Sequence, residues 1–177
     1  MKPIIFRPEL SVTIGDGRKT VTRRLKAPTY ERGTLLYVRE TFWHCAEFKE
    51  GPGPDRANPQ VPAWVFGEEP KDFFYIDELP ANHKPIDIPG FRWKKRPGIH
   101  MPRFCSRLHL RVVSIHEERL SGATEWDARA EGFETLSEFR AKWDEINPDA
   151  PWISNPNVHV IEFETAWKSS RFSKEAA

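Results

Sequence analysis

The sequence predicts an α+β domain in which a small, partly open β-barrel carries short flanking helices and a proline-rich insertion. Three observations predict this class. The chain has 177 residues, a length that fits one domain. Runs with strand-like alternation outnumber the helical ones. Eight of the 16 prolines fall in residues 46–91, which indicates an insertion on a smaller core.

The N-terminal part is predicted to begin with a short strand at Pro3–Phe6 and a helix that starts near Pro8. Proline followed by an acidic residue suits a first helical turn, and Gly15 and Gly17 would end the helix. The segment GTLLYVRETFW, residues 33–43, follows from a glycine into a β-rich run. We therefore predict one strand over this segment.

Within the insertion, the sequence predicts a β-hairpin. VPAWVF, residues 61–66, and DFFYID, residues 72–77, are joined by the turn-like GEEPK, residues 67–71. A structureless loop of this length is uncommon unless it is functional. The insertion is therefore either a lid or substrate-shaping arm, or a decoration of the core.

The C-terminal half is predicted to contain two strands with two helices between them. Residues 103–115 alternate between apolar and basic side chains, so this strand has one basic face, made of Arg103, Arg107, His109 and Arg111. The last strand, residues 157–163, completes a β-α-β order. Residues 168–177 are expected to form a flexible tail.

Capping signals mark both helices. The first opens near Thr124, with Asp127 three residues on. The second opens with Thr135 and Glu138 in capping-box spacing. Its predicted apolar stripe consists of Leu136, Phe139, Trp143 and Ile146.

Charge is segregated along the chain, although the formal net charge is only +1. Residues 1–40 hold nine Lys and Arg against four Asp and Glu, and residues 92–111 hold seven against none. Residues 113–149 reverse the balance, with four against ten. This pattern is typical of a protein with a basic face that attracts polyanions, unless folding mixes the blocks into a neutral surface.

Membrane, disulfide and zinc classes are not indicated. No apolar run approaches the ~18–20 residues of a membrane helix, and the N-terminus has too short an apolar stretch for a signal peptide. We therefore expect a cytoplasmic protein that does not associate with membranes. Cys45 and Cys105 lie far apart, without the spacing of a metal site, so we expect neither a disulfide framework nor a bound metal.

The segment GRKTVTRR, residues 17–24, places four cations and two threonines in eight positions. It is a solvated basic turn, a phosphate clamp or part of a catalytic site. A threonine hydroxyl needs an adjacent base, and a lysine serves as that base only if its pKa is lowered. Neighbouring arginines favour the neutral amine of Lys19, whereas a nearby Glu131 carboxylate favours the charged form. Residues alone do not settle the balance.

Strand geometry constrains this site. In a regular strand, residues 19 and 22 point to opposite faces, because side chains alternate with a period of two. Both reach one pocket only if Lys19 precedes the strand, on the turn made by Gly15 and Gly17, or if a bulge intervenes.

Five motifs in order resemble the ASCH domain, in the longer form common in phages and prophages. They are GRKTVTRR, GTLLYVRETFW, RPGIHMPRFCSRLHL, ATEWDARAEGF and NPNVHVIEFE. The resemblance runs from the N-terminus to about residue 164 and skips residues 46–91. It implies one domain over residues 1–177, with a β-barrel similar to the PUA domain, a fold that holds RNA or modified bases.

The resemblance also implies an activity. Some small ASCH proteins are amidohydrolases that remove the acetyl group of N4-acetylcytidine with a lysine, a threonine and a glutamate, which map onto Lys19, Thr22 and Glu131. We expect Lys19 as base, Thr22 as nucleophile and Glu131 as proton donor, with no metal or organic cofactor. The alternatives are a non-catalytic reader of RNA or a modified base, and a ribonuclease, since another ASCH protein has been described as one.

Further side chains are expected to bind the substrate, a nucleoside or single-stranded nucleic acid, with RNA favoured. A planar guanidinium suits a phosphate or a base carbonyl, and an aromatic ring beside basic residues suits stacking on a base. The alternatives are solubilising charge for the arginines and core packing for the aromatic residues. The predicted substrate-binding set is Arg23, Arg24, Arg39, Trp43, His100 and Arg103.

Overall fold

The computed structural model describes residues 1–52, 62–64, 73–79, 84–85, 87 and 91–169. These residues form a mixed α+β fold with two sheets and few helices, which confirms the α+β part of the predicted class, whereas the partly open barrel stays a prediction. The chain divides into two compact units. The first comprises Met1–Val38 and Ser106–Ala177, and the second comprises Arg39–Cys105.

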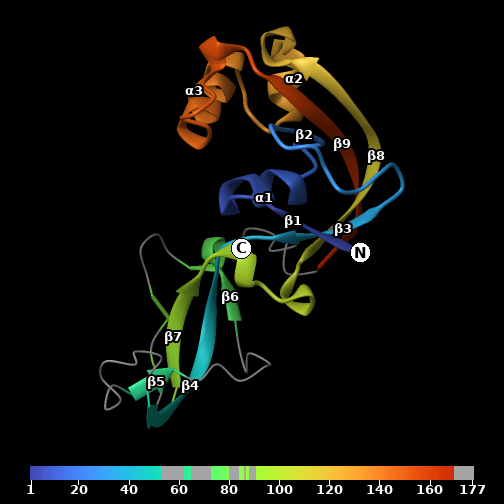
Figure 1. Ribbon diagram of the computed structural model, residues 1–177. Coiled ribbons are helices and arrows are strands. Elements are labelled where there is room, and N and C mark those ends of the chain that lie inside the picture. Colours follow the sequence, from blue (N-terminus) through green and yellow to red (C-terminus); the bar gives the residue numbers. More distant parts are fainter. Residues whose placement is uncertain (53–61, 65–72, 80–83, 86, 88–90, 170–177) are drawn as a thin grey trace, which may run out of the picture. The chain divides into compact units, whose positions relative to one another are not determined.

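The first unit contains a five-stranded sheet with the order β1-β3-β8-β9-β2. The long strands β8 and β9 pair antiparallel and form the curved ribbon coloured yellow and red in Figure 1. Strand β2 pairs with β9 and ends the sheet, with Thr22 opposite Ile161. The strands are β1 Lys2–Ile5, β2 Val21–Arg24, β3 Leu35–Arg39, β8 Leu108–Arg119 and β9 Asn157–Lys168.

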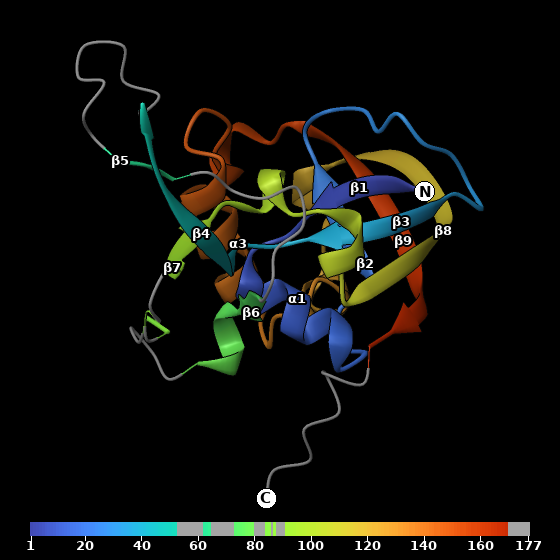
Figure 2. The same ribbon diagram turned by 90° about the horizontal axis from the view of Figure 1, so that it is seen from below.

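Helix α1, Pro8–Gly15, packs against the concave side of this sheet (Figures 1 and 2). Its Ile14 is almost fully buried among side chains of the strands. The core of the first unit consists of Ile4, Phe6, Ile14, Leu36, Val38, Leu108, Leu110, Val112, Ile161 and Phe163. The first helix therefore follows the predicted pattern. The predicted basic face of residues 103–115 is wrong in part, because Arg107 is buried and Arg103 lies outside the strand.

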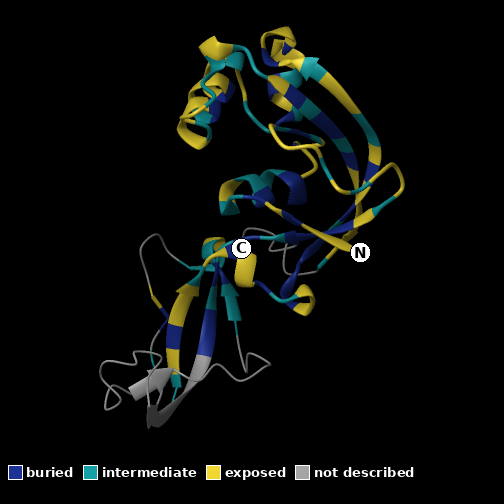
Figure 3. Cartoon of the chain, viewed as in Figure 1, coloured by how far each residue is buried: buried dark blue, intermediate teal, exposed yellow. Residues whose placement is uncertain are grey.

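Helices α2, Glu125–Ala130, and α3, Leu136–Ile146, lie together where β8 ends and β9 begins (Figure 1). Short 3-10 turns flank them, η4 Leu120–Gly122 and η5 Trp152–Ser154. Each helix is buried on one side and exposed on the other (Figure 3). The second core cluster consists of Leu120, Ala123, Ala128, Phe139, Trp143 and Val158, whereas the predicted stripe residue Ile146 is exposed.

The predicted caps differ in detail. At α2, Thr124 and Asp127 form a complete capping box. At α3, the Thr135 hydroxyl accepts the Glu138 N–H, as predicted, but the Glu138 carboxylate accepts the N–H of Glu134 instead of that of Thr135. The second capping box is therefore only half formed.

In the second unit, strand β4 pairs with three others. These strands are β4 Phe42–Pro52, β5 Pro62–Trp64, β6 Phe73–Tyr75 and β7 Phe91–Arg96. Three 3-10 turns follow the strands, η1 Ile76–Glu78, η2 Gly98–His100 and η3 Arg103–Cys105. Phe42, Tyr75, Met101 and Cys105 form its buried cluster.

The single strand predicted over residues 33–43 is wrong, because two strands in different sheets occupy this segment. The chain leaves β3 after Arg39 and enters β4 at Phe42. Between them, the Glu40 N–H points to the sulfur of Met101 at 3.4 Å. A Cβ atom on Gly98 would lie only 3.1 Å from the Glu40 carbonyl carbon, so the backbone of this glycine packs directly on the connection. These contacts take Glu40 out of the strand ladder.

The predicted hairpin of the insertion is also corrected. Strands β5 and β6 fall within its two arms, but each pairs with β4, and the predicted turn at residues 67–71 lies outside the described residues. The second unit extends beyond the predicted insertion at both ends.

The two predicted C-terminal strands both end later than expected. Arg103–Cys105 form a 3-10 turn, so β8 starts at Leu108 instead of residue 103 and runs on to Arg119. Strand β9 continues to Lys168, which removes the first residue of the predicted tail, and residues 170–177 lie outside the described residues. Among the described residues, no helix is long and apolar enough to span a membrane.

Candidate functional site

Lys19 lies on the turn between α1 and β2, just before the strand that contains Thr22. Gly17 has a φ of +78°, a conformation that glycine adopts without strain. The Lys19 N–H donates to the Thr13 carbonyl at the end of α1, at 3.0 Å. Thr20 then donates to the Ala130 carbonyl of α2 at 2.8 Å. These hydrogen bonds fix the turn between the ends of α1 and α2. Lys19 therefore precedes β2, as a pocket shared with Thr22 requires.

The Lys19 ammonium is buried and fully hydrogen-bonded. Its side chain is 1% exposed. Nζ donates to the Val21 carbonyl at 2.7 Å, to the Glu131 carbonyl at 2.9 Å and to Glu131 Oε2 at 2.5 Å. An ammonium has three N–H donors, so three acceptors satisfy it completely.

Glu131 is positioned by the way that α2 ends. The Gly132 N–H donates to Arg129 and the Phe133 N–H to Ala128, which is a Schellman motif. Gly132 has the positive φ of +93° that this motif requires at the residue after Glu131. The turn directs both the carbonyl and the carboxylate of Glu131 at Lys19, and Oε1 accepts the Arg23 main-chain N–H at 2.7 Å.

Gly132→Ala is expected to lower the free energy of unfolding by about 2 kcal/mol. A Cβ atom there would lie 2.8 Å from Thr13 Oγ1 and 3.2 Å from Lys19 Cβ, in addition to the cost of a positive φ. Urea denaturation measures the change. Gly33→Ala is the matched control, because Gly33 has a φ of +82° and a Cβ atom added to it would have nothing within 4 Å.

The control should cost about 1 kcal/mol, which is the backbone cost alone. Combining Thr13→Ala with Gly132→Ala should recover part of the difference, because it removes the nearest contact. Equal losses for the two glycine variants would mean that the close packing against Thr13 and Lys19 contributes nothing.

Arg23 is surrounded by three carboxylates, and its side chain is 1% exposed. Nε donates to Glu118 at 2.7 Å, Nη2 to Asp127 at 2.6 Å and Nη1 to Glu131 at 3.4 Å. Its guanidinium also lies 5.9 Å from the ring centre of Phe139. This arrangement favours a positioning role over the predicted substrate contact, because the guanidinium already holds the Glu131 carboxylate.

Thr22 and Arg24 lie on the opposite face of β2 from Arg23, because side chains alternate along a strand. The Arg24 guanidinium is 5.1 Å and Lys19 Nζ is 5.7 Å from the ring centre of Phe6, so both cations lie over this ring. Thr22 is 5% exposed, and Lys19 Nζ contacts the carbonyl of the preceding residue. The structure therefore brings Lys19, Thr22 and Glu131 into one neighbourhood.

Burial lowers the pKa of Lys19 below its ordinary value of 10.5. The Glu131 carboxylate opposes this change, and Arg24 and Arg23 add to it. The sequence suggested that the neighbouring arginines would lower this pKa. Removal from water is the larger cause, because it penalises the charged form of any amine.

Four of the predicted substrate-binding residues belong to the second unit, which also contains Cys105. Arg39 Nη1 donates to the Ile99 carbonyl at 3.1 Å. Trp43 is half-buried in β4, opposite Phe74 and Lys95. His100 and Arg103 are exposed on η2 and η3. That these four contact the same substrate as Lys19 stays a prediction.

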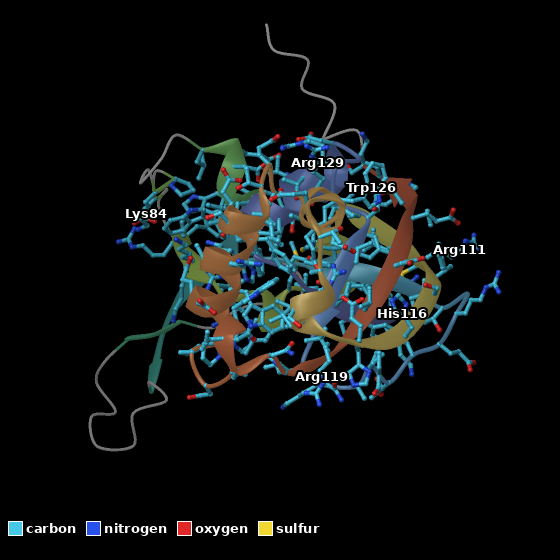
Figure 4. The ribbon with its side chains drawn as sticks, turned by 90° about the horizontal axis from the view of Figure 1, so that it is seen from above. Lys84, Arg111, His116, Arg119, Trp126 and Arg129 are labelled. Atoms are coloured by element: carbon cyan, nitrogen blue, oxygen red, sulfur yellow. The ribbon has the colours of Figure 1, made fainter. Side chains whose placement is uncertain are left out.

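Sequence reasoning missed two members of the Arg23 cluster, Glu118 and Asp127. Asp127 was recognised only as a cap of α2, although its second oxygen also binds Arg23. The available signal was charge, since the basic segment 17–24 has a complement in the acidic segment 113–149. The outward face of α2 carries other side chains. Trp126 and Arg129 project from it (Figure 4), and Trp126 is 77% exposed.

Comparisons with known proteins leave the family open. No protein-family model matches the chain, and no curated protein matches it. Among solved structures, similarity is found to the crystal structure of protein EF3133 from Enterococcus faecalis V583, family-model DUF984. The identity is 10%, the match covers 96% of this chain and 84% of that chain, and the TM-score is 0.46. These comparisons do not confirm the ASCH resemblance.

Proposed function

We propose that this protein is a hydrolase that removes an acyl group from the exocyclic amine of a cytosine-type base, with Lys19, Thr22 and Glu131 as catalytic residues. The proposal rests on the buried 2.5 Å contact between Lys19 Nζ and Glu131 Oε2, two residues 112 positions apart. This pair also binds the backbone on either side of Thr22, at the Val21 carbonyl and the Arg23 N–H. A buried ion pair is often no more stabilising than apolar residues of similar size. Buried titratable groups next to a hydroxyl are therefore candidates for chemistry.

The remaining parts of the proposal follow the motif resemblance. The first unit would be a PUA-like, ASCH-type domain, and its curved sheet with α1 on the concave side supports this. The substrate would be a nucleoside or a base of single-stranded RNA in the cytoplasm, and the reaction would need no metal or organic cofactor. A fold alone hosts many functions, so the proposal depends on the residues of the site.

One proton transfer across the Lys19–Glu131 contact produces both groups that amide hydrolysis requires. With the proton on Glu131, Lys19 is a neutral amine that accepts a proton, and Glu131 is an acid that donates one. Burial favours this neutral pair over two charges, in the same direction as the lowered pKa of Lys19. The ion pair and the reactive pair are then two states of the same hydrogen bond.

In the proposed reaction, Thr22 Oγ1 attacks the acyl carbon while its proton moves to Lys19. The bond between the acyl carbon and the exocyclic nitrogen then breaks. The nucleobase leaves as the free amine with a proton from Glu131, and the acyl group stays on Thr22 as an ester. Water hydrolyses the ester, so that the acid departs and the Thr22 hydroxyl is restored. A proton passing from Lys19 to Glu131 resets the pair, and the net reaction consumes one water per amide.

A non-catalytic reader is the second candidate, and one observation favours it. The three Nζ hydrogens of Lys19 already have acceptors, so no lone pair faces Thr22 in this state. Side-chain exposure of 1% and 5% for Lys19 and Glu131 also means that a substrate must displace neighbouring groups to reach them. A Lys19 that never gives up its proton would leave the site able to bind and unable to turn over.

Turnover of N4-acetylcytidine to cytidine distinguishes these candidates. We expect Thr22→Val to lower kcat/KM by at least about 1,000-fold, because the variant keeps the shape of the side chain and loses the nucleophile. Thr22→Ser is the matched control and should retain activity. The wild-type rate should fall as pH rises through the lowered pKa of Lys19, because the pair then holds no proton and Glu131 cannot protonate the leaving amine.

Three results would overturn the hydrolase. These are no cytidine from the wild type, equal rates for Thr22→Val and Thr22→Ser, and release of shortened strands from RNA. The last result identifies a ribonuclease. Circular dichroism of each variant separates loss of chemistry from loss of folding.

A further inference from the structure

The segment from Pro97 to Cys105 in the second unit is firmly anchored. Two turns shape it, with the Met101 N–H donating to the Gly98 carbonyl at 2.9 Å and the Cys105 N–H donating to the Pro102 carbonyl at 3.1 Å. Met101 and Cys105 are fully buried. The Cys105 carbonyl accepts the Tyr75 hydroxyl at 2.8 Å. The backbone of this loop is therefore held in place at several points.

Between these anchors, the loop presents two large apolar side chains to solvent. Ile99 and Phe104 are each 58% exposed. His100 and Arg103, next to them in the sequence, are exposed as well. An aromatic ring that stays exposed to solvent on an anchored loop indicates a surface for binding a partner.

Along the sequence, the segment that contains this loop carries charge of one sign. The sequence contains no Asp or Glu from residue 92 to residue 111, and seven Lys and Arg. The loop continues directly from β7, where Lys95 is exposed. Cations beside a stackable ring match the two parts of a single-stranded nucleic acid, because phosphates pair with the charges and bases stack on the ring.

We propose that the loop of residues 97–105 binds single-stranded nucleic acid, with Phe104 stacking on a base and Arg103 contacting phosphate. An anionic membrane fits less well, because Ile99 and Phe104 are five positions apart and His100, Pro102 and Arg103 lie between them. The inference uses none of Lys19, Thr22 and Glu131, so it stands apart from the proposed hydrolase.

Fluorescence anisotropy with a labelled single-stranded RNA of mixed sequence tests this loop. Phe104→Ala should weaken binding by roughly 5- to 100-fold, which corresponds to the loss of one stacked base. Arg103→Glu should weaken binding and reduce the dependence of affinity on salt, because fewer counterions are released. Phe104 and Arg103 are exposed, so both variants should fold.

Two matched controls lie on the first unit. Trp126→Ala removes a more exposed aromatic ring, and Arg119→Glu reverses the charge of an arginine; both residues belong to the acidic segment 113–149 (Figure 4). Binding should be unchanged in both. The proposal is overturned if Phe104→Ala binds RNA like the wild type, or if the controls weaken binding equally. It is also overturned if Phe104→Ala abolishes binding to phosphatidylserine-containing vesicles and leaves RNA binding intact.

Discussion

Replacing Glu131 with alanine is expected to lower the free energy of unfolding by about 3–5 kcal/mol, because removing one partner of a buried pair leaves the other charge uncompensated. The Lys19 ammonium would keep two carbonyl acceptors and lose the carboxylate. The Arg23 main-chain N–H would also lose its acceptor inside the protein. Chemical denaturation followed by tryptophan fluorescence measures the change.

Glu118→Gln is the matched control for this variant. Glu118 also binds Arg23 through a short contact, but its side chain is 27% exposed, so water can replace the carboxylate. We expect a cost of about 1 kcal/mol or less. Similar costs for Glu131→Ala and Glu118→Gln would contradict the view that burial makes the Lys19–Glu131 pair sensitive.

The sequence was sufficient for elements whose signals are local. The proline at the start of α1 and the Thr124–Asp127 box of α2 each act within a few residues. The positions of β3 and β4 depended on a distant contact, because Gly98 and Met101 pack on Glu40 and separate the two strands. A pattern read along residues 33–43 contains no trace of this contact.

The candidate site likewise has features that the sequence predicted and features that depend on distant contacts. The sequence offered two ways for Lys19 to share a pocket with Thr22, a turn before the strand or a bulge, and the structure has the turn. The family resemblance pointed to Glu131. The sequence did not reveal that Arg23 binds three carboxylates from β8 and α2, since a guanidinium in a basic segment gives no sign of its partners. Nor could it rank burial above the neighbouring arginines as the cause of the lowered Lys19 pKa, because burial is a property of the fold.

Arg23→Leu should lower the free energy of unfolding by about 3 kcal/mol near neutral pH, because three carboxylates would lose the cation that they share. Arg23→Lys should recover only part of this loss, since an ammonium cannot bind several carboxylates at once as a guanidinium does. Arg24→Leu is the control. Arg24 is half-buried, and its described hydrogen bond is to the Ile5 carbonyl, so a smaller loss is expected.

The loss caused by Arg23→Leu should shrink in acid. Burial raises the pKa of Asp127, but hydrogen bonds from Thr124 and Arg23 outweigh it and hold this pKa below the ordinary 3.8. A lowered carboxylate pKa stabilises the fold above the ordinary pKa and loses this effect as pH falls through the folded value. The wild type should therefore lose more stability than Arg23→Leu between about pH 7 and about pH 3. Parallel loss in urea titrations at the two pH values would mean that Arg23 acts through packing, including its contact with Phe139, and that its charge does not hold the carboxylates in place.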